Sequence, residues 1–279
     1  MCSVYEDFMG IKLVVSDLDG CLLRSDGSLP DNFREAFGIM QQQGVVFAAA
    51  SGRSAAGAKR PFGVLADKID LISDNGARVY HGNHIVFQRI LPYEEYRPVV
   101  EEIRKHEGLL AVACGEKGAW VEDLSSVTDD MAQELLKYYP TWRECSFECI
   151  PDKIIKFALL YFDDIEKNIY PVLQQFDNDR ICVQVTAFVW IDVFEKGISK
   201  GMGVAALQDE LGITSAETVV FGDYLNDISM ADVASVSCAP LNAHRKVKER
   251  FTKVIGSNEE GSVPETIINL LSNNIQEGA

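Results

Sequence analysis

Residues 11–20 read Ile-Lys-Leu-Val-Val-Ser-Asp-Leu-Asp-Gly, an apolar stretch that ends in two carboxylates. A run rich in β-branched residues predicts a parallel strand that is buried on both faces of a sheet. Open parallel sheets bind ligands just beyond the carboxyl ends of their strands, which is where Asp17 and Asp19 stand. Two carboxylates this close repel each other unless a cation or a shared proton intervenes. The stretch therefore indicates a metal site, an acid–base pair or a nucleophile, with a solvated surface turn as the alternative.

Composition limits what the protein can be. The chain has 279 residues, 47% of them hydrophobic, which suits one large domain or two ordinary ones. Its net charge of −16 argues against nucleic acid as a partner, because binding phosphate backbones requires clustered Lys and Arg. No apolar run approaches the ~20 residues needed to span a membrane, and residues 1–10 do not resemble a secretory signal. Seven scattered cysteines without a Cys-x-x-Cys pair predict reduced thiols and a cytoplasmic location.

The order of apolar and helical segments predicts an α/β fold. Short apolar strands that alternate with helical segments indicate right-handed βαβ units and a parallel sheet. The expected strands are 11–16, 45–50, 69–73, 218–222 and 235–238. Residues 89–191 mix helices with antiparallel-looking strands and predict an α+β domain of their own. We therefore expect a Rossmann-like core of residues 1–88 and 192–279, interrupted by an inserted domain at 89–191.

Polar side chains follow four of the expected parallel strands. These residues are Asp17 with Asp19, Ser51, Asn75, and Asp223 with Asn226 and Asp227. Because parallel strands of one sheet point the same way, their carboxyl ends should bring these groups to one rim. Lys200 opens an expected helix, where a cation is mildly unfavourable, and this misfit favours a functional lysine.

Four motifs occur in a specific order along the chain. They are Asp-Leu-Asp-Gly at 17–20, Ser-Gly-Arg at 51–53, Ser-Lys-Gly at 199–201 and Gly-Asp-x-x-Asn-Asp at 222–227. In this order and context, the chain resembles the haloacid dehalogenase superfamily of phosphotransferases. The resemblance extends to the Cof-type branch, subclass IIB, through the insertion and two further patterns. Those patterns are Asp74-Asn75-Gly76-Ala77 and the tail from Asn242-Ala243 to Gly256-Ser257-Asn258.

The resemblance implies a reaction at the first motif. Asp17 would be the nucleophile, attacking phosphorus in line to form an aspartyl-phosphate. Asp19 would protonate the leaving alcohol and later activate water. The cofactor would be Mg²⁺, with Asp17, the backbone carbonyl of Asp19, and Asp223 as its protein ligands.

The remaining motifs would hold the phosphoryl group. Ser51 and the amide of Gly52 would donate hydrogen bonds to its oxygens, and Lys200 would neutralise them. Asn226 would contact phosphate or a metal-bound water, and Asp227 would orient Lys200 or such a water. Simpler interpretations stay open. Asn226 could cap the next helix, and Asp227 could be an acidic residue of the kind that is common in the first turn of a helix.

Several other residues carry weaker hypotheses. Arg53 either reaches the substrate or is solvated. The histidines at positions 81 and 84 have no evident third ligand and are interpreted as surface residues, and Trp120, Trp142 and Trp190 are expected in a core. The family usually has Thr where this chain has Cys21, which removes a hydroxyl without removing a charge or a metal ligand. Cys21 would make the site sensitive to oxidation only if the pKa of its thiol were depressed.

The leading hypothesis is a Mg²⁺-dependent phosphatase for small phosphorylated metabolites, and the resemblance implies sugar phosphates. The inserted domain would act as a lid that excludes water and selects the substrate. The alternatives are a sugar phosphomutase with the same aspartyl-phosphate, a non-enzymatic phospho-accepting switch, and a binding protein without catalysis. The sequence carries no signal of an oligomeric state.

Overall fold

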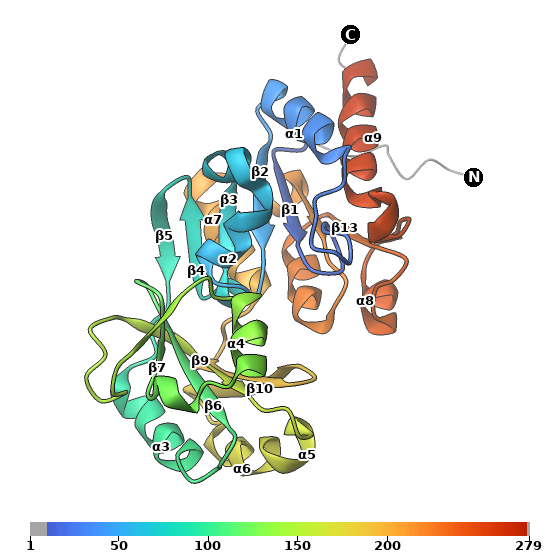
Figure 1. Ribbon diagram of the computed structural model, residues 1–279. Helices are drawn as coiled ribbons and strands as arrows, with labels where there is room; N and C mark the ends of the chain where they lie inside the picture. Colours follow the sequence, from blue (N-terminus) through green and yellow to red (C-terminus); the bar gives the residue numbers. More distant parts are fainter. Residues whose placement is uncertain (1–9, 278–279) are drawn as a thin grey trace. The chain divides into compact units, whose positions relative to one another are not determined.

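The structure is a computed structural model that describes residues 10–277. The described chain folds as two compact units, which Figure 1 shows in colours that follow the sequence. The first unit ends at Gln88 and resumes at Ser199, and the second runs from Arg89 to Ile198. Among residues 10–277, no helix has both the length and the apolar character needed to cross a bilayer.

In the described part of the chain, the first unit contains one eight-stranded sheet. Its strands are β1 (Leu13–Asp17), β2 (Val46–Ala50), β3 (Asp70–Ser73), β4 (Arg78–His81), β5 (His84–Gln88), β12 (Thr218–Phe221), β13 (Val236–Ala239) and β14 (Lys253–Val254). They lie in the order β14-β13-β12-β1-β2-β3-β4-β5. All neighbours from β14 to β3 are parallel, and β4 and β5 add an antiparallel hairpin. The predicted parallel sheet is confirmed.

Helices cover both faces of this sheet. They are α1 (Phe33–Gln42), α2 (Ala55–Lys59), α7 (Lys200–Leu211), α8 (Arg245–Arg250) and α9 (Ser262–Glu277), with 3₁₀ helices η1 (Arg60–Lys68), η2 (Asp74–Gly76), η5 (Ser215–Glu217), η6 (Leu225–Val233) and η7 (Asn258–Glu260). Alternate residues of β1 enter two cores: Val14 packs with residues of α1 and α9, whereas Leu13 and Val15 pack with α7. This double burial explains the continuous apolar run of the first strand.

The second unit, residues 89–198, is an α+β domain. Its strands are β6 (Leu110–Gly115), β7 (Ala119–Val121), β8 (Trp142–Glu144), β9 (Ile154–Leu160), β10 (Ile181–Ala187) and β11 (Trp190–Glu195), and its helices are α3 (Tyr93–Ile103), η3 (Leu124–Ser126), α4 (Asp129–Leu136), α5 (Ile165–Asn168), α6 (Tyr170–Leu173) and η4 (Gln174–Phe176). The sheet order is β10-β11-β9-β6-β7-β8, antiparallel except for the parallel pair β7–β8. Two hydrophobic clusters of this unit take alternate residues of β9, such as Phe157 and Ala158.

The predicted boundary at residues 191 and 192 is wrong by seven residues. Strand β11 spans Trp190–Glu195 and pairs with β9 and β10, so the inserted unit keeps this strand and continues to Ile198. A boundary between residues 191 and 192 would divide this strand, whose residues on both sides of that point pair with β9 and β10. The first boundary, between residues 88 and 89, lies where it was predicted.

The final helix also differs from the prediction. The sequence predicts a helix over 264–271 with a frayed tail at 272–279, whereas α9 runs from Ser262 to Glu277. Residues 278–279 lie outside the described residues, as do residues 1–9, to which the secretory-signal argument applies.

Candidate active site

The strand ends meet as the sequence predicts. Asp17 is the last residue of β1 and pairs with Ala50, directly before Ser51. Ser16 pairs with Phe221 of β12, two residues before Asp223. Beyond β3, Oδ1 of Asn75 accepts a hydrogen bond from Asn226 Nδ2 at 2.9 Å. The parallel register therefore gathers residues that are up to two hundred positions apart in the chain at one rim.

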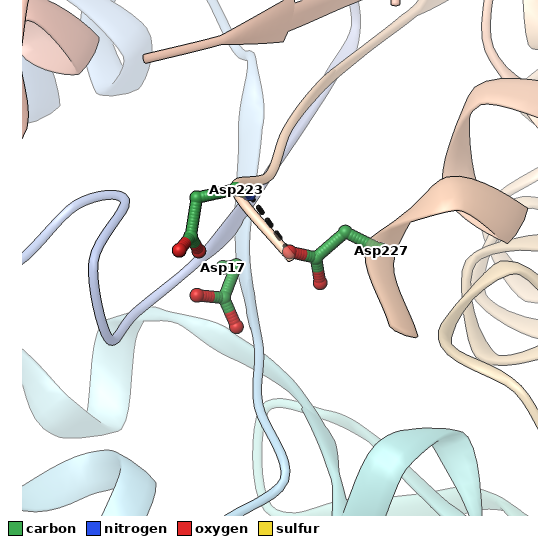
Figure 2. Close-up of side chains that lie close together, drawn as sticks. All are labelled: Asp17, Asp223 and Asp227. Atoms are coloured by element: carbon green, nitrogen blue, oxygen red, sulfur yellow. Dashed lines mark hydrogen bonds between the residues drawn. The ribbon is translucent and has the colours of Figure 1, made fainter. Parts of the chain in front are cut away.

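Three carboxylates form the centre of this rim. Figure 2 shows Asp17, Asp223 and Asp227 turned toward one another, and one carboxylate oxygen of each lies within 4.8 Å of the others. Burial, opposed by Lys200 and reinforced by Asp227, raises the pKa of Asp17 well above its usual range. Burial and then the charge of Asp227 raise the pKa of Asp223 to about 7. The cluster thus crowds three acidic groups where water is scarce, so Asp17 and Asp223 hold their protons more tightly than free carboxyl groups do.

Lys200 is the cation that balances this cluster. It begins α7, is 1% exposed, and donates hydrogen bonds to Asp17 Oδ1 and, at 2.6 Å, to Asp227 Oδ1. Burial opposes its charge, but Asp17 and Asp227 outweigh burial and raise its pKa above the usual value. Lys200 is therefore not an exposed lysine of a first helical turn.

Asp227 has both oxygens occupied by protein donors. Its Oδ1 accepts from Lys200, and its Oδ2 accepts from the amides of Asp223 and Tyr224, both at 2.9 Å. This geometry suits a residue that orients its neighbours. Asp223 differs, since its Oδ1 is buried and has no hydrogen-bond partner among the described residues. A buried carboxylate oxygen without a protein partner fits a ligand of a cation.

Glycine is required at position 20. Its φ of +79° lies in the left-handed region, and a Cβ there would stand 2.5 Å from Asp223 Oδ2. The loop after β1 therefore approaches Asp223 more closely than any residue with a side chain would allow.

Asp19 is placed differently from Asp17. Its side chain is 54% exposed, and both of its oxygens accept hydrogen bonds from Arg53, one of them from Nε at 2.8 Å. The sequence suggested substrate contact or solvation for Arg53 and did not predict this two-pronged pairing. The spacing of residues along the chain carries no information about side-chain rotamers.

The Ser-Gly-Arg motif forms a tight turn beside these residues. Ser51 is 1% exposed, and its Oγ accepts a hydrogen bond from the Arg53 amide at 3.1 Å. A Cβ on Gly52 would lie 3.2 Å from Oδ1 of Asn75, so the Asn75 side chain packs directly against this glycine. The sequence indicates Asn75 only as a residue at the end of a strand and gives it no role. The hydrogen bond between Asn226 and Asn75 was not predicted.

Two alternatives from the sequence are wrong. Asn226 does not cap η6, because Tyr224 occupies the cap position. Cys21 is not a reactive thiol: burial and then the charge of Asp17 raise its pKa well above the usual range. Its Sγ lies 3.8 Å from Ser16 Oγ, within the buried core.

Other expectations outside the rim are confirmed. Trp120 and Trp190 are each 5% exposed within the cores of the second unit, and Trp142 packs against the cluster that contains Trp190. The histidines at positions 81 and 84 are exposed, and the first of them contacts Asp70 Oδ2 at 2.8 Å.

Comparison with characterised proteins agrees with the site. A family model described as haloacid dehalogenase-like hydrolase matches residues 14–267. The 5-amino-6-(5-phospho-D-ribitylamino)uracil phosphatase YbjI of Escherichia coli is 28% identical over 268 residues, covering 94% of this chain and 97% of its own. The Bacillus subtilis phosphatase of the same name, YcsE, is 26% identical over 268 residues and covers 95% and 98%.

Solved structures share the fold. A haloacid dehalogenase-like hydrolase from Bacteroides thetaiotaomicron gives a TM-score of 0.81 at 25% identity, covering 93% of this chain and 99% of that one. A HAD subclass IIB sugar phosphatase, BT4131, gives 0.78 at 22% identity, covering 92% and 98%. The family match spans both units and every motif of the rim: the chain belongs to the haloacid dehalogenase-like hydrolase family and is a phosphatase.

Proposed function

We propose that the protein is a Mg²⁺-dependent phosphatase that hydrolyses small phosphorylated metabolites through an aspartyl-phosphate on Asp17. The observation that carries this proposal is the position of the Asp17 carboxylate. It stands at the end of β1, bonded to Lys200 on one side and close to Asp223 on the other. A nucleophile for phosphoryl transfer needs a cation on hand to reduce its repulsion from the phosphate.

The residues present fit a magnesium ion. Carboxylate and carbonyl oxygens are the ligands that Mg²⁺ prefers, and the buried Oδ1 of Asp223 has no other partner among the described residues. Asp17, Asp223 and the backbone carbonyl of Asp19 would hold the ion, and Asp227 would not, because its oxygens are engaged. When bound, the ion would supply positive charge to the transferring phosphoryl group.

Residues of the chain itself would carry out the two steps of the reaction. An oxygen of Asp17 forms a bond to phosphorus as the bond from phosphorus to the leaving alcohol breaks, and the alcohol takes a proton. Water later attacks the same phosphorus, releasing phosphate and restoring the Asp17 carboxylate. Lys200 stays beside Asp17 throughout and offsets the charge of the phosphoryl oxygens. Ser51, the amide of Gly52, and Asn226 would bind those oxygens.

Asp19 would move the proton in both steps. Because Arg53 engages both of its carboxylate oxygens, this role requires the pair to separate when the substrate arrives. The freed guanidinium would then be available to an anionic substrate.

The substrate is proposed as a sugar phosphate or a related polyol phosphate in the cytoplasm. The subclass IIB resemblance favours sugar phosphates, and two relatives are named for a phosphoribitylamino compound. The second unit, residues 89–198, would act as the lid that selects among such molecules.

A panel assay tests the proposal. Purified protein is given hexose phosphates, pentose phosphates and 5-amino-6-(5-phospho-D-ribitylamino)uracil, with Mg²⁺ or with a chelator, and released phosphate is measured. Release that requires Mg²⁺ and disappears in Asp17→Asn supports the proposal. Full activity in Asp17→Asn, or no turnover of any ester, contradicts it. Isomerised sugar without released phosphate would identify a mutase, and stable stoichiometric phosphorylation a switch.

A further inference from the structure

The loop that follows Asp17 lies along a distant part of the same unit. We call residues 18–25 the catalytic loop, because it contains Asp19 and Gly20. Ser25 donates from its amide to the Glu259 side chain at 2.7 Å, and Arg24 Nε donates to the Glu259 carbonyl at 3.4 Å. The loop is therefore attached to residues that lie more than two hundred positions later in the chain.

Two asparagines hold the centre of the catalytic loop. Asn242 Nδ2 donates to the Gly20 carbonyl at 2.7 Å, and Asn258 Nδ2 donates to the Leu23 carbonyl at 2.9 Å. The amide of Asn258 also donates to Oδ1 of Asn242 at 3.1 Å, so the two asparagines are joined. Asn258 is 6% exposed, whereas Asn242 lies at the surface.

The opposite side of the loop approaches Asp223, because a Cβ on Gly20 would lie 2.5 Å from Asp223 Oδ2. Within the loop, Leu23 donates from its amide to the Leu18 carbonyl at 2.8 Å, which ties the two ends of this turn together. A shift of the Gly20 or Leu23 carbonyl would therefore move the backbone between them and the neighbouring Asp19.

We propose that Asn242 and Asn258 are positioning residues for catalysis, which hold the catalytic loop so that the Asp19 backbone and Asp223 keep the spacing of one cation site. The inference rests on the proposed function and deepens it. It also gives a role to the tail pattern from Asn242-Ala243 to Gly256-Ser257-Asn258. The proposed reaction uses no residue of this pattern.

Asparagine suits this task because its side chain both donates and accepts. Asn242 needs its Nδ2 for the Gly20 carbonyl and its Oδ1 for the Asn258 amide. Aspartate has nearly the same size and keeps the acceptor, but it places an anionic oxygen against a carbonyl. An Asn→Asp change thus removes the attachment to the loop and leaves the volume of the side chain nearly unchanged.

The test compares Asn242→Asp and Asn258→Asp with a matched control, Asn32→Asp. Asn32 Nδ2 donates to the Gly261 carbonyl at 3.0 Å, so its side chain binds the same tail, and among the described residues it makes no hydrogen bond to the catalytic loop. Hydrogen exchange of peptides covering residues 18–25 is measured on the full chain by mass spectrometry, together with kcat and KM for the best ester of the panel.

In Asn258→Asp we expect faster exchange in residues 18–25, unchanged exchange in β2, and kcat lowered about 10-fold with KM altered less than about 3-fold. Asn242→Asp should show the same pattern to a smaller degree, because its bond to Gly20 is exposed. If Asn258→Asp does not fold, the surface position of Asn242 keeps the test available.

Unchanged exchange and unchanged kcat in the folded variants would overturn the inference, as would equal losses in Asn32→Asp. Hydrogen exchange needs no turnover, so an inactive wild-type protein would contradict the proposed function alone. Accelerated exchange with a normal kcat would show that the asparagines stabilise the loop without positioning it for catalysis, and would also overturn the inference.

Discussion

At the scale of single residues, the site is organised by one buried ammonium group among carboxylates. Lys200 bonds to both Asp17 and Asp227 and is almost wholly enclosed. Taking these charges out of water is costly, and only their mutual attraction and hydrogen bonds offset that cost. Removing one of these buried charges should therefore lower the free energy of unfolding much more than removing an exposed charge does.

Replacing Lys200 with Met should lower the free energy of unfolding by about 3–5 kcal/mol, because two buried carboxylates lose their cation. Urea denaturation of the Lys200→Met variant measures this loss. Lys246→Met, at an exposed position of α8, is the control and should change stability by less than about 0.5 kcal/mol. Equal stability of both variants would show that Lys200 does not balance the cluster.

The pKa of Asp223 predicts how metal binding depends on pH. Its pKa rises from the ordinary 3.8 to about 7 on folding, so the folded state binds this proton more tightly than the unfolded state does. The stability that Asp223 contributes is present below pH 3.8 and is lost as the pH rises through about 7. Mg²⁺ needs the deprotonated form, so its binding should strengthen over the same range.

Thermal unfolding with and without Mg²⁺ measures this linkage. The rise in Tm caused by Mg²⁺ should be larger at pH 8 than at pH 6, and Asp223→Asn should abolish most of it. The same rise at both pH values would contradict the assignment of Asp223 as a ligand.

Most of the site could be predicted from the sequence, because parallel strands bring their carboxyl ends together whatever the loops do. Asp17, Ser51 and Asp223 follow from that rule. Lys200 follows from a different argument, because a cation is mildly unfavourable in the first turn of a helix. The pairing of Arg53 with Asp19 could not, because it depends on side-chain conformations in a turn.

At the scale of elements, the start of α7 is fixed by its contact with η2. A Cβ on Gly76 would lie 2.1 Å from the Ser199 carbonyl, directly before Lys200, and the φ of Gly76 is +99°. Any side chain at position 76 must push away the first turn of the helix that supplies the lysine.

Gly76→Ala should therefore reduce phosphatase activity by at least about 10-fold, because it displaces Lys200 from Asp17. Gly44→Ala is the control: the φ of Gly44 is +70°, but an added Cβ would meet nothing within 4 Å, so this variant tests backbone strain alone. Steady-state assays of both variants distinguish displacement of Lys200 from an effect of backbone strain alone. Comparable activity in the two would mean that the contact at Ser199 does not set the lysine's position.

Elements were predicted best where the chain shows long, regular patterns. Strand β1 begins with the apolar residues Leu13, Val14 and Val15, and strand β9 is apolar except for Lys156. Strand β8 was missed because it has only three residues, two of them charged and exposed. The sequence predicts one helix over 164–176. In the structure this segment is divided into α5, α6 and η4, with Ile169 between α5 and α6 and Pro171 in the first turn of α6.

At the scale of the whole molecule, the chain consists of two units with separate hydrophobic cores. The clusters of the second unit contain only residues between Leu91 and Val193, including Phe157 and Leu159. A lid that moves as a body needs this independence, because it must keep its own fold while its position changes.

A fragment of residues 89–198 should therefore fold by itself. We expect a single cooperative urea transition and a native-like near-ultraviolet signal from its three tryptophans, Trp120, Trp142 and Trp190. A fragment without a cooperative transition would show that the unit depends on the rest of the chain, against the lid proposal.

The proposed aspartyl-phosphate on Asp17 can be trapped chemically. The protein is mixed with a labelled phosphate ester and Mg²⁺, quenched in acid within one turnover, and digested for mass spectrometry. We expect an acid-stable, base-labile phosphoryl group on the peptide that contains Asp17, and we expect none in Asp17→Asn. A phosphoryl group on Asp19 or elsewhere, or turnover with no labelled protein at any quench time, would contradict it.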